Sequence, residues 1–331
     1  MVSYTIKRLL WMIPIMVGVI LIVFSISYFM PGDPVQAALG QDYTQEEYDK
    51  KAEAMGLTGG YFEQLGRYFN NLIHGSFGIS YSTQRPVTTE LKGRVWTSIK
   101  LGLLSCLVTT VISIPIGVIT AVKNNSALDY IVTGVAVFLA CMPGFWVALM
   151  LIVLFSQKLG WLPATGLTTW KHYILPVVSN ALSPVAIVCR MTRSSMLEVI
   201  NQDYIRTARA KGVAERTVIL KHALKNALIP IITVVGSQFS MVIGGSVIIE
   251  SIFNIQGMGA RLVTAINSRD YSMILGITIV MSTFTMVIML VVDLVYAMVD
   301  PRIKAEFSAG SKWAAKRAQK KKEEAEQGGV A

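Results

Sequence analysis

A short cationic segment at residues 203–230 carries the side chains best suited to specific recognition. It begins Asp203-Tyr-Ile-Arg-Thr-Ala-Arg-Ala-Lys-Gly212. Because glycine tolerates the left-handed conformation that often ends helices, Gly212 predicts a break between two short helices. The second helix would lead into the next apolar stretch, so the segment would project helical surface away from the rest of the chain.

The first of these helices has the character of a docking element. Ala208 and Ala210 leave little side-chain bulk, and the donors around them are Arg206, Arg209 and Lys211. A partner protein could take such a helix into a groove. An ordinary positively charged loop is the alternative, and charge alone does not separate the two.

Three ionisable residues lie in or next to apolar stretches, where charges are costly. Asp293 precedes Pro301 by eight residues, about 12 Å along a helix. Arg190 should reach a similar depth, so an Arg190–Asp293 ion pair is one hypothesis and separate snorkelling to the interface is the other. Glu250, together with Asn254 and Gly257, could contact a partner on the opposite face, although an interfacial carboxylate needs no special role.

Neither the cysteines nor the histidines are spaced as metal ligands. No catalytic residue, metal site or cofactor is therefore predicted. The residues concerned are Cys106, Cys141, Cys189, His74, His172 and His222.

The composition indicates an integral membrane protein. Of the 331 residues, 53% are hydrophobic and only 15% are charged, and the mean hydropathy is +0.53. A soluble chain of this length would be more polar. The net charge of +10 comes from short basic segments, which fit the ends of membrane spans better than a nucleic-acid partner.

About six transmembrane helices are expected, so the predicted fold class is an all-α, multi-pass membrane protein. The fourth span is the weakest because it is short and contains Asn180, Ser183 and Pro184. Pro143-Gly144 should kink the third span. The predicted spans cover residues 9–30, 99–122, 130–155, 173–189, 229–252 and 273–299.

The distribution of basic residues predicts that both termini are cytoplasmic. Lys7, Arg8, Lys123, the segment 190–225 and the tail then face the cytoplasm, whereas the long loop at 31–98 has more acidic than basic residues. The chain divides into residues 1–30 with the first span, an extracytoplasmic loop at 31–98, a five-helix core at 99–300 and a basic tail at 301–331.

The outer loop should contain short helices. Thr44 and Glu47 have capping-box spacing, which predicts a helix that ends near Gly56. Residues 61–73 alternate apolar and polar side chains at helical spacing, which predicts an amphipathic helix lying on the membrane surface or on the bundle.

The cytoplasmic segment carries a family resemblance. Arg206-Thr207-Ala208, followed by Gly212, resembles the EAA loop of bacterial ABC importer permeases. The closest likeness is to the first permease, the B-type subunit, of dipeptide and oligopeptide importers, a family that also transports nickel. His222-Ala223-Leu224 and Asn226-Ala227-Leu228 resemble that branch too, whereas Arg206-Thr207 replaces the Glu-Ala of the general family.

The resemblance extends over nearly the whole chain. It includes Pro31-Gly32-Asp33-Pro34, Gly75-Ser76-Phe77-Gly78, Trp161-Leu162-Pro163 and Arg269-Asp270-Tyr271. It implies a type I ABC importer permease fold in a bacterial inner (plasma) membrane, with a coupling loop at about 196–228.

The resemblance also implies function and partners. Residues 203–225 would dock on an ATPase, and the chain would pair with a second, homologous permease, two ATP-binding subunits and an external substrate-binding protein that delivers peptides. The chain lacks the phosphate-binding sequence GxxxxGK[ST], so ATP hydrolysis would belong to the partners and the chain itself would be no enzyme.

Two alternatives remain open. An ion- or proton-coupled secondary transporter would work without an ATPase, but it favours midplane carboxylates and inverted repeats, and neither is clear here. A membrane receptor or scaffold acting through its outer loop would leave the segment from Arg206 to Gly212 unexplained.

Overall fold

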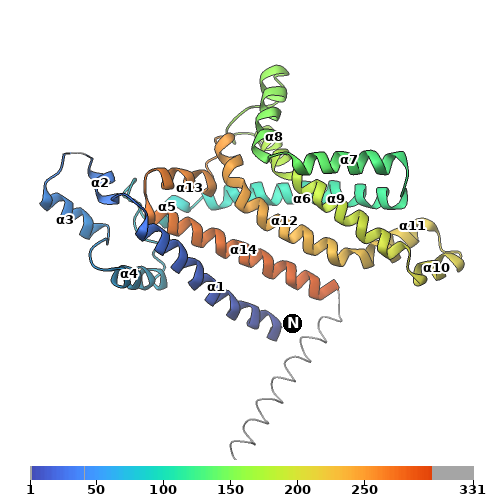
Figure 1. Cartoon of the computed structure of the whole chain (residues 1–331), viewed down its shortest axis with the longest axis horizontal. Helices are drawn as coiled ribbons and strands as arrows, with labels where there is room; N and C mark the ends of the chain where they lie inside the picture. Colours follow the sequence, from blue (N-terminus) through green and yellow to red (C-terminus); the bar gives the residue numbers. More distant parts are fainter. Residues whose placement is uncertain (1, 41, 300–331) are drawn as a thin grey trace, which may run out of the picture.

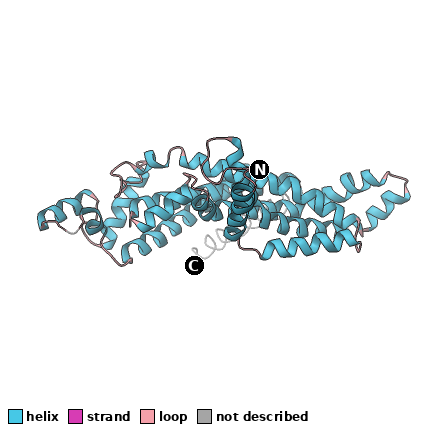
Figure 2. Cartoon of the chain, turned by 90° about the horizontal axis from the view of Figure 1, so that it is seen from above, coloured by secondary structure: helices cyan, strands magenta, loops and turns pink. Residues whose placement is uncertain are grey.

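The computed structural model describes residues 2–40 and 42–299, and this part of the chain is almost entirely helical. The long helices run side by side along the long axis of the molecule, with α2, α3 and α4 gathered at one end and α10 and α11 at the other (Figure 1). Seen from above, the molecule is long and narrow (Figure 2). The tail predicted at 301–331 lies outside the described residues.

The helices can be named in chain order. They are α1 (Val2–Phe29), α2 (Pro34–Leu39), α3 (Gln45–Ala54), α4 (Tyr61–Ile73), α5 (Val87–Leu91), α6 (Arg94–Val122), α7 (Ala127–Cys141), α8 (Gly144–Leu151), α9 (Ile174–Ile200), α10 (Asp203–Ala210), α11 (Glu215–Thr217), α12 (Leu224–Ile252), α13 (Met258–Asn267) and α14 (Tyr271–Val299).

The expectation of about six membrane spans is confirmed. Within the described residues, five helical stretches are long and apolar enough to cross a bilayer, and a bent helix pair brings the number to six if it forms one span. The five stretches lie along α1, α6, α9, α12 and α14.

The third span bends far more than an ordinary kink. Its two parts, α7 and α8 with the π-helical turn at Ile152–Lys158, meet at an angle of 102°. Met142 and Pro143 are both extended, with ψ angles of 130° and 129°. A residue before proline avoids the helical conformation, so the helix ends at Cys141 and restarts at Gly144 in a new direction.

The fourth span is longer than predicted. Residues 173–189 were expected, but α9 continues to Ile200. The extension buries Thr192, Ser195 and Met196. Since the hydroxyl of Thr192 donates to the carbonyl of Val188 at 2.8 Å, this polar residue is satisfied within its own helix. Packing of this kind is invisible to a search for apolar runs.

Two buried clusters hold the ends of the bundle. One joins α6, α9, α10 and α12 through Val118, Met196, Ile205 and Ile231. The other joins α5, α13 and α14 through Val87, Met258 and Met273, among others. The elements outside the long helices are therefore packed against the bundle at both ends.

The predicted outer helices are present. Thr44 caps α3, and the backbone amide of Thr44 donates to the Glu47 carboxylate at 2.8 Å, which completes the capping box. The amphipathic segment forms α4, whose Tyr61 hydroxyl lies 2.7 Å from the hydroxyl of Ser25 on α1. The outer helices thus lean on the first span.

Gly117 marks a close approach between α6 and α9. A Cβ atom there would be closer to Thr192 and to the carbonyl of Cys189 than real side-chain contacts allow, whereas a Cβ at Gly134 on α7 would meet nothing within 4 Å. We expect Gly117→Ala to lower the free energy of unfolding by about 1–3 kcal/mol, because the helices must separate. Gly134→Ala should be neutral or slightly stabilising. Thermal denaturation of the purified chain in detergent would measure both, and equal behaviour of the two variants would contradict this packing.

Candidate functional site

The segment between α9 and α12 forms an elbow, by which we mean residues 203–223. It consists of α10, a turn, the short α11 and a π-helical turn at Val218–Ala223 that runs directly into α12. Figure 1 shows it at the end of the molecule opposite α2 and α3.

Gly212 ends α10 in the predicted way. Its φ angle is +75°, in the left-handed region that favours glycine. The amide of Gly212 donates to the carbonyl of Arg209 at 2.9 Å, and that of Val213 donates to the carbonyl of Ala208 at 3.3 Å. This pair of hydrogen bonds is the Schellman motif, which closes the helix end and fixes the turn.

The inner face of the elbow is anchored in the bundle. Ile205, Val218 and Ala223 are fully buried in the cluster that α6, α9 and α12 share, and Ala208 packs against it. Residues from both limbs of the elbow thus bury apolar surface on the same helices. The elbow and the ends of α9 and α12 should move as one body.

The outer face of the elbow is exposed and cationic. Arg206, Thr207, Arg209, Ala210, Lys211 and Gly212 are exposed. The guanidinium of Arg209 forms two hydrogen bonds to the carboxylate of Glu215, at 2.6 and 3.1 Å, which tie the two limbs together across the turn. Ala208 is half-buried and packs against the cluster of the bundle, whereas Ala210 is exposed.

A buried ion pair close to the elbow escaped the sequence analysis. Arg193 on α9 binds both oxygens of Asp129 on α7, at 2.5 and 2.7 Å. Asp129 is 2% exposed, and it also accepts from the backbone amide of Asn125 at 3.1 Å. The pair fixes the turn between α6 and α7 on α9. Ser126 and Asp129 at helix-capping spacing were the available signal, but nothing in the sequence identified Arg193 as the partner.

Glu250 does not face an external partner. It is fully buried, and its carboxylate accepts from the hydroxyl of Ser98 at 2.6 Å and from the amides of Gly259 and Ala260 at 2.7 and 3.1 Å. Those amides lie in the first turn of α13, where a helix favours negative charge. Glu250 therefore joins α6, α12 and α13.

Two further residues, Asn254 and Gly257, were predicted to contact the same partner as Glu250, and they differ in exposure. Gly257 is buried, and any side chain there would collide with the Glu250 carboxylate. Asn254 is exposed, in a left-handed turn with φ +49°. Only Asn254 of the three remains accessible to a partner.

The predicted partner of Asp293 was also wrong. Its carboxylate lies 2.9 Å from the guanidinium of Arg8 on α1, and no ion pair joins it to Arg190 among the residues that the structure describes. Arg190 is exposed on α9, whereas α1 packs along α14 and brings Arg8 beside Asp293. A similar predicted depth in the membrane does not determine which helices are neighbours.

At the opposite end, Asp270 and Arg261 form a second buried polar centre that the sequence analysis missed. Asp270 accepts from the amide of Tyr81 at 3.0 Å and from the hydroxyl of Ser82 at 2.8 Å. Arg261 lies between Asp270 and Glu90, at 3.9 and 3.8 Å. The loop at residues 80–90 is therefore tied to α13 and α14.

No group of three or more His, Cys, Asp or Glu side chains that could hold a metal ion occurs within residues 2–40 and 42–299. The arrangement of the elbow supports protein recognition rather than bond chemistry, because its exposed groups are cations on a fixed helix.

Comparison with known families matches two models to the chain. "Binding-protein-dependent transport system inner membrane component" covers residues 113–305, and the N-terminal model of the same transport systems covers residues 1–102.

Two curated relatives match over nearly their full length. The dipeptide transport system permease protein DppB of Alkalihalophilus pseudofirmus is 40% identical over 92% of this chain and 100% of the relative. The glutathione transport system permease protein GsiC of Escherichia coli strain K12 is 37% identical over 92% of this chain and 99% of the relative.

A solved structure shares the fold. A chain of the MetNI methionine ABC transporter, in an inward-facing conformation, superposes with a TM-score of 0.54 at 18% identity, over 64% of this chain and 97% of that one. The expected type I importer permease fold is thereby confirmed.

Double-mutant cycles can distinguish the Arg8–Asp293 pair from the Arg190–Asp293 pair that the sequence suggested. We expect Arg8→Ala and Asp293→Ala to be non-additive by about 0.5 kcal/mol or more in unfolding free energy, because the side chains are in contact. Arg190→Ala and Asp293→Ala should add. Thermal unfolding of all variants in the same detergent would test this, and coupling of Asp293 to Arg190 alone would reverse the assignment.

Glu250→Gln should destabilise the outer end of the bundle. The two α13 amides donate to the same oxygen, so the amide side chain can still accept from them, but it loses the negative charge that favours the start of α13 and the oxygen that accepts from the Ser98 hydroxyl, at a cost of about 1–3 kcal/mol. Glu198→Gln, at an exposed position on α9, is the matched control. Hydrogen exchange of α13 would report the effect locally. Unchanged protection of α13 in Glu250→Gln would count against the capping role.

Proposed function

Because the chain belongs to the family of binding-protein-dependent transport system inner membrane components, we propose that it lines part of the channel through which an ATP-driven importer moves short peptides. The chain is a multi-pass permease subunit of the inner membrane. Peptides are the proposed substrate because relatives at 37–40% identity are named for dipeptide and glutathione transport, and glutathione is itself a tripeptide.

The exposed cationic face of the elbow is the observation that carries the coupling role. Arg206, Arg209 and Lys211 offer donors to a partner, while Ile205 on the opposite side of α10 is fully buried. A partner that grips the outer face would move α9 and α12 through the inner face. This is the arrangement that a motor subunit needs in order to act on membrane helices.

An importer of this family needs partner proteins, as its description as binding-protein-dependent indicates. It contains no GxxxxGK[ST] sequence, so we assign ATP hydrolysis to two separate ATP-binding subunits. A second, homologous permease would complete the channel, and an external binding protein would deliver the peptide. The exposed Asn254, near the outer end of α12, is a candidate contact for that binding protein, whereas Glu250 and Gly257 act inside the fold.

Transport would alternate between two arrangements of the helices. When the ATPases close, the elbow would be displaced as a rigid lever, since its two limbs are joined by the Arg209–Glu215 pair and by the turn at Gly212. The Arg193–Asp129 pair would transmit the displacement from α9 to α7. The cytoplasmic side would thereby close as the outer side opens.

Charge reversal on the exposed face should uncouple the ATPase without unfolding the permease. We expect Arg206→Glu combined with Ala210→Glu to abolish co-purification of the ATPase from native membranes in mild detergent, because both positions are exposed and repulsion replaces donation. The second permease should still co-purify, and ATP-dependent peptide uptake should fall at least tenfold.

Lys92→Glu is the matched control, since Lys92 is exposed near the outer end of the bundle. Retention of the ATPase and of uptake by the elbow variant would refute docking through this face.

A further inference from the structure

Helix α4 leaves a row of apolar side chains uncovered beside the outer end of α1. Phe62 and Ile73 are 84% and 81% exposed, and Phe69 lies between them, half-buried, on the same side of the helix. The three residues share a face because an α-helix has 3.6 residues per turn. We call this row the α4 stripe. An exposed apolar surface of this kind marks a site of interaction.

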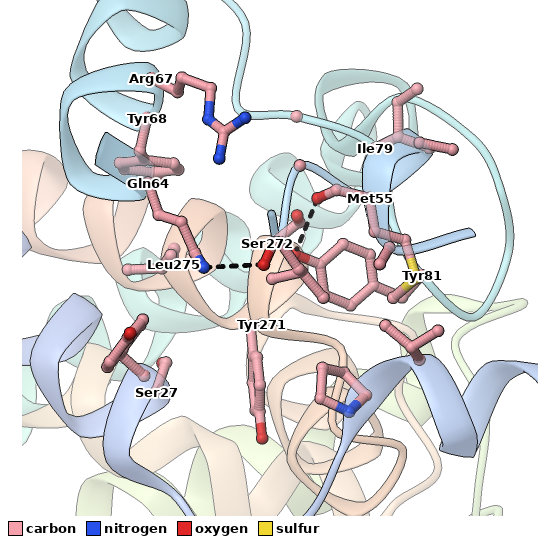
Figure 3. A pocket seen from close by; sticks show the side chains of 18 of the residues that line it. Ser27, Met55, Gln64, Arg67, Tyr68, Ile79, Tyr81, Tyr271, Ser272 and Leu275 are labelled. Atoms are coloured by element: carbon pink, nitrogen blue, oxygen red, sulfur yellow. Dashed lines mark hydrogen bonds between the residues drawn. The ribbon is translucent and has the colours of Figure 1, made fainter. Parts of the chain in front are cut away.

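The opposite side of α4 faces the protein. Gln64, Arg67 and Tyr68 line a cavity of about 670 Å³ that extends to the first turn of α14, and Figure 3 shows them on that side of the helix. None of the three stripe residues lines this cavity. The α4 stripe therefore points away from the cavity and from the bundle.

Aromatic contacts place α4 beside the last turn and a half of α1. The ring of Tyr61 packs edge-to-face on Phe24 and on Tyr28, with centroids 5.5 and 5.2 Å apart. Tyr68 is two turns further along α4, and its ring centroid lies 6.1 Å from that of Phe24. Phe24 precedes the end of α1 at Phe29 by about 7.5 Å. The contacts thus lie at the outer end of the span.

The length of the first span sets the height of these contacts. The apolar stretch Thr5–Phe29 has 25 residues, about 36 Å as a helix, whereas the hydrocarbon core is about 30 Å thick. The last turn of α1 therefore reaches the headgroup region. Tyrosine is enriched at that level, where its ring meets acyl chains and its hydroxyl meets water. Tyr28 and Tyr61 are positioned in this way.

The apolar surface of α1 continues onto the α4 stripe. Ile22, Ile26 and Phe29 are all more than half exposed and recur at helical spacing along α1. The ring of Phe29 stacks on that of Tyr61, with centroids 6.0 Å apart, and Phe62 follows Tyr61 in the chain. A single apolar surface thus runs from the outer half of a membrane span to the start of α4.

A polar edge completes the pattern of α4. Glu63, Asn70 and His74 are exposed and lie on one side of the helix, next to the stripe and away from α1. A helix with an apolar stripe and a polar edge lies in the plane of the membrane interface, with the apolar side among the lipids.

We propose that α4 is an interfacial helix whose stripe, formed by Phe62, Phe69 and Ile73, inserts among the lipids of the outer leaflet. The sequence offered the membrane surface and the bundle as alternatives, and on this account α4 contacts both. Because α2, α3 and α4 together line the cavity, lipid contact by α4 would hold these outer helices at a fixed height. The proposal depends on neither the substrate nor the ATPase.

The test measures whether labelled positions on α4 meet lipid or water. The chain, with the subunits that co-purify with it, is placed in phosphatidylcholine nanodiscs without a binding protein. One nitroxide at a time is attached to Phe62→Cys, Ile73→Cys, Glu63→Cys or Asn70→Cys, all at exposed positions where substitution should not disturb folding. The native cysteines are first replaced by alanine, namely Cys106, Cys141 and Cys189.

Electron paramagnetic resonance then compares collisions of the nitroxide with oxygen, which dissolves in lipid, and with chromium oxalate, which stays in water. At positions 62 and 73, oxygen should be the more effective, and at positions 63 and 70, chromium oxalate. If chromium oxalate is the more effective at 62 and 73, the stripe faces water and the proposal is overturned. Protection of 62 and 73 from both reagents would mean that a protein covers the stripe, which also overturns it.

A second measurement leaves the native cysteines in place. Phe62→Ser combined with Ile73→Ser should raise the hydrogen-exchange rates of the α4 amides in the same nanodiscs about tenfold or more, because even one large apolar side chain moved out of water is worth about this factor. Asn70→Ser, on the polar edge, is the matched control and should exchange like the unmodified chain. Equal exchange in the double variant and the control would refute lipid insertion.

Discussion

The hydrocarbon core of a bilayer offers no hydrogen-bond partner, so a polar group buried among membrane helices is costly unless another group of the protein satisfies it. Three buried carboxylates meet this requirement here. Asp129 binds Arg193 and the turn before α7, Glu250 binds the first turn of α13, and Asp270 binds the loop at residues 80–82. Each carboxylate attaches a non-spanning segment to a long helix.

The elbow depends on the same kind of attachment. Its apolar side is buried with Ile205, and its turn is closed by the backbone hydrogen bonds around Gly212. The side that remains exposed is cationic. A surface can transmit force only if it is rigidly joined to what it moves, and the buried side of α10 supplies that junction to α9 and α12.

Much of the fold could be predicted from the sequence, because the signals were local. The length of the apolar runs predicted the spans, the capping pair Thr44 and Glu47 predicted α3, and Gly212 predicted the end of α10. Features that depend on packing between helices could not be predicted. One example is α9, which continues to Ile200 because other helices bury its polar residues. The 102° bend was underestimated, since Pro143 predicts a break but not its angle.

The candidate site shows the same division. The exposed residues of the elbow were identified from their spacing, but the packing of Ala208 against the bundle was not foreseen and Arg193 was overlooked. Arg190 was paired with Asp293 on depth alone, although α1 provides Arg8. Glu250 was read as accessible because a carboxylate next to a loop usually is, whereas the first turn of α13 offers it amide donors inside the fold.

The central claim, that an ATPase docks on the exposed face of the elbow, is tested most directly by site-specific photocrosslinking in native membranes. A benzophenone amino acid at position 210 should form an adduct with a chain that carries the GxxxxGK[ST] sequence, and the same group at position 92 should not. An adduct of this kind from position 92 but not from position 210, or none from either, would contradict the account.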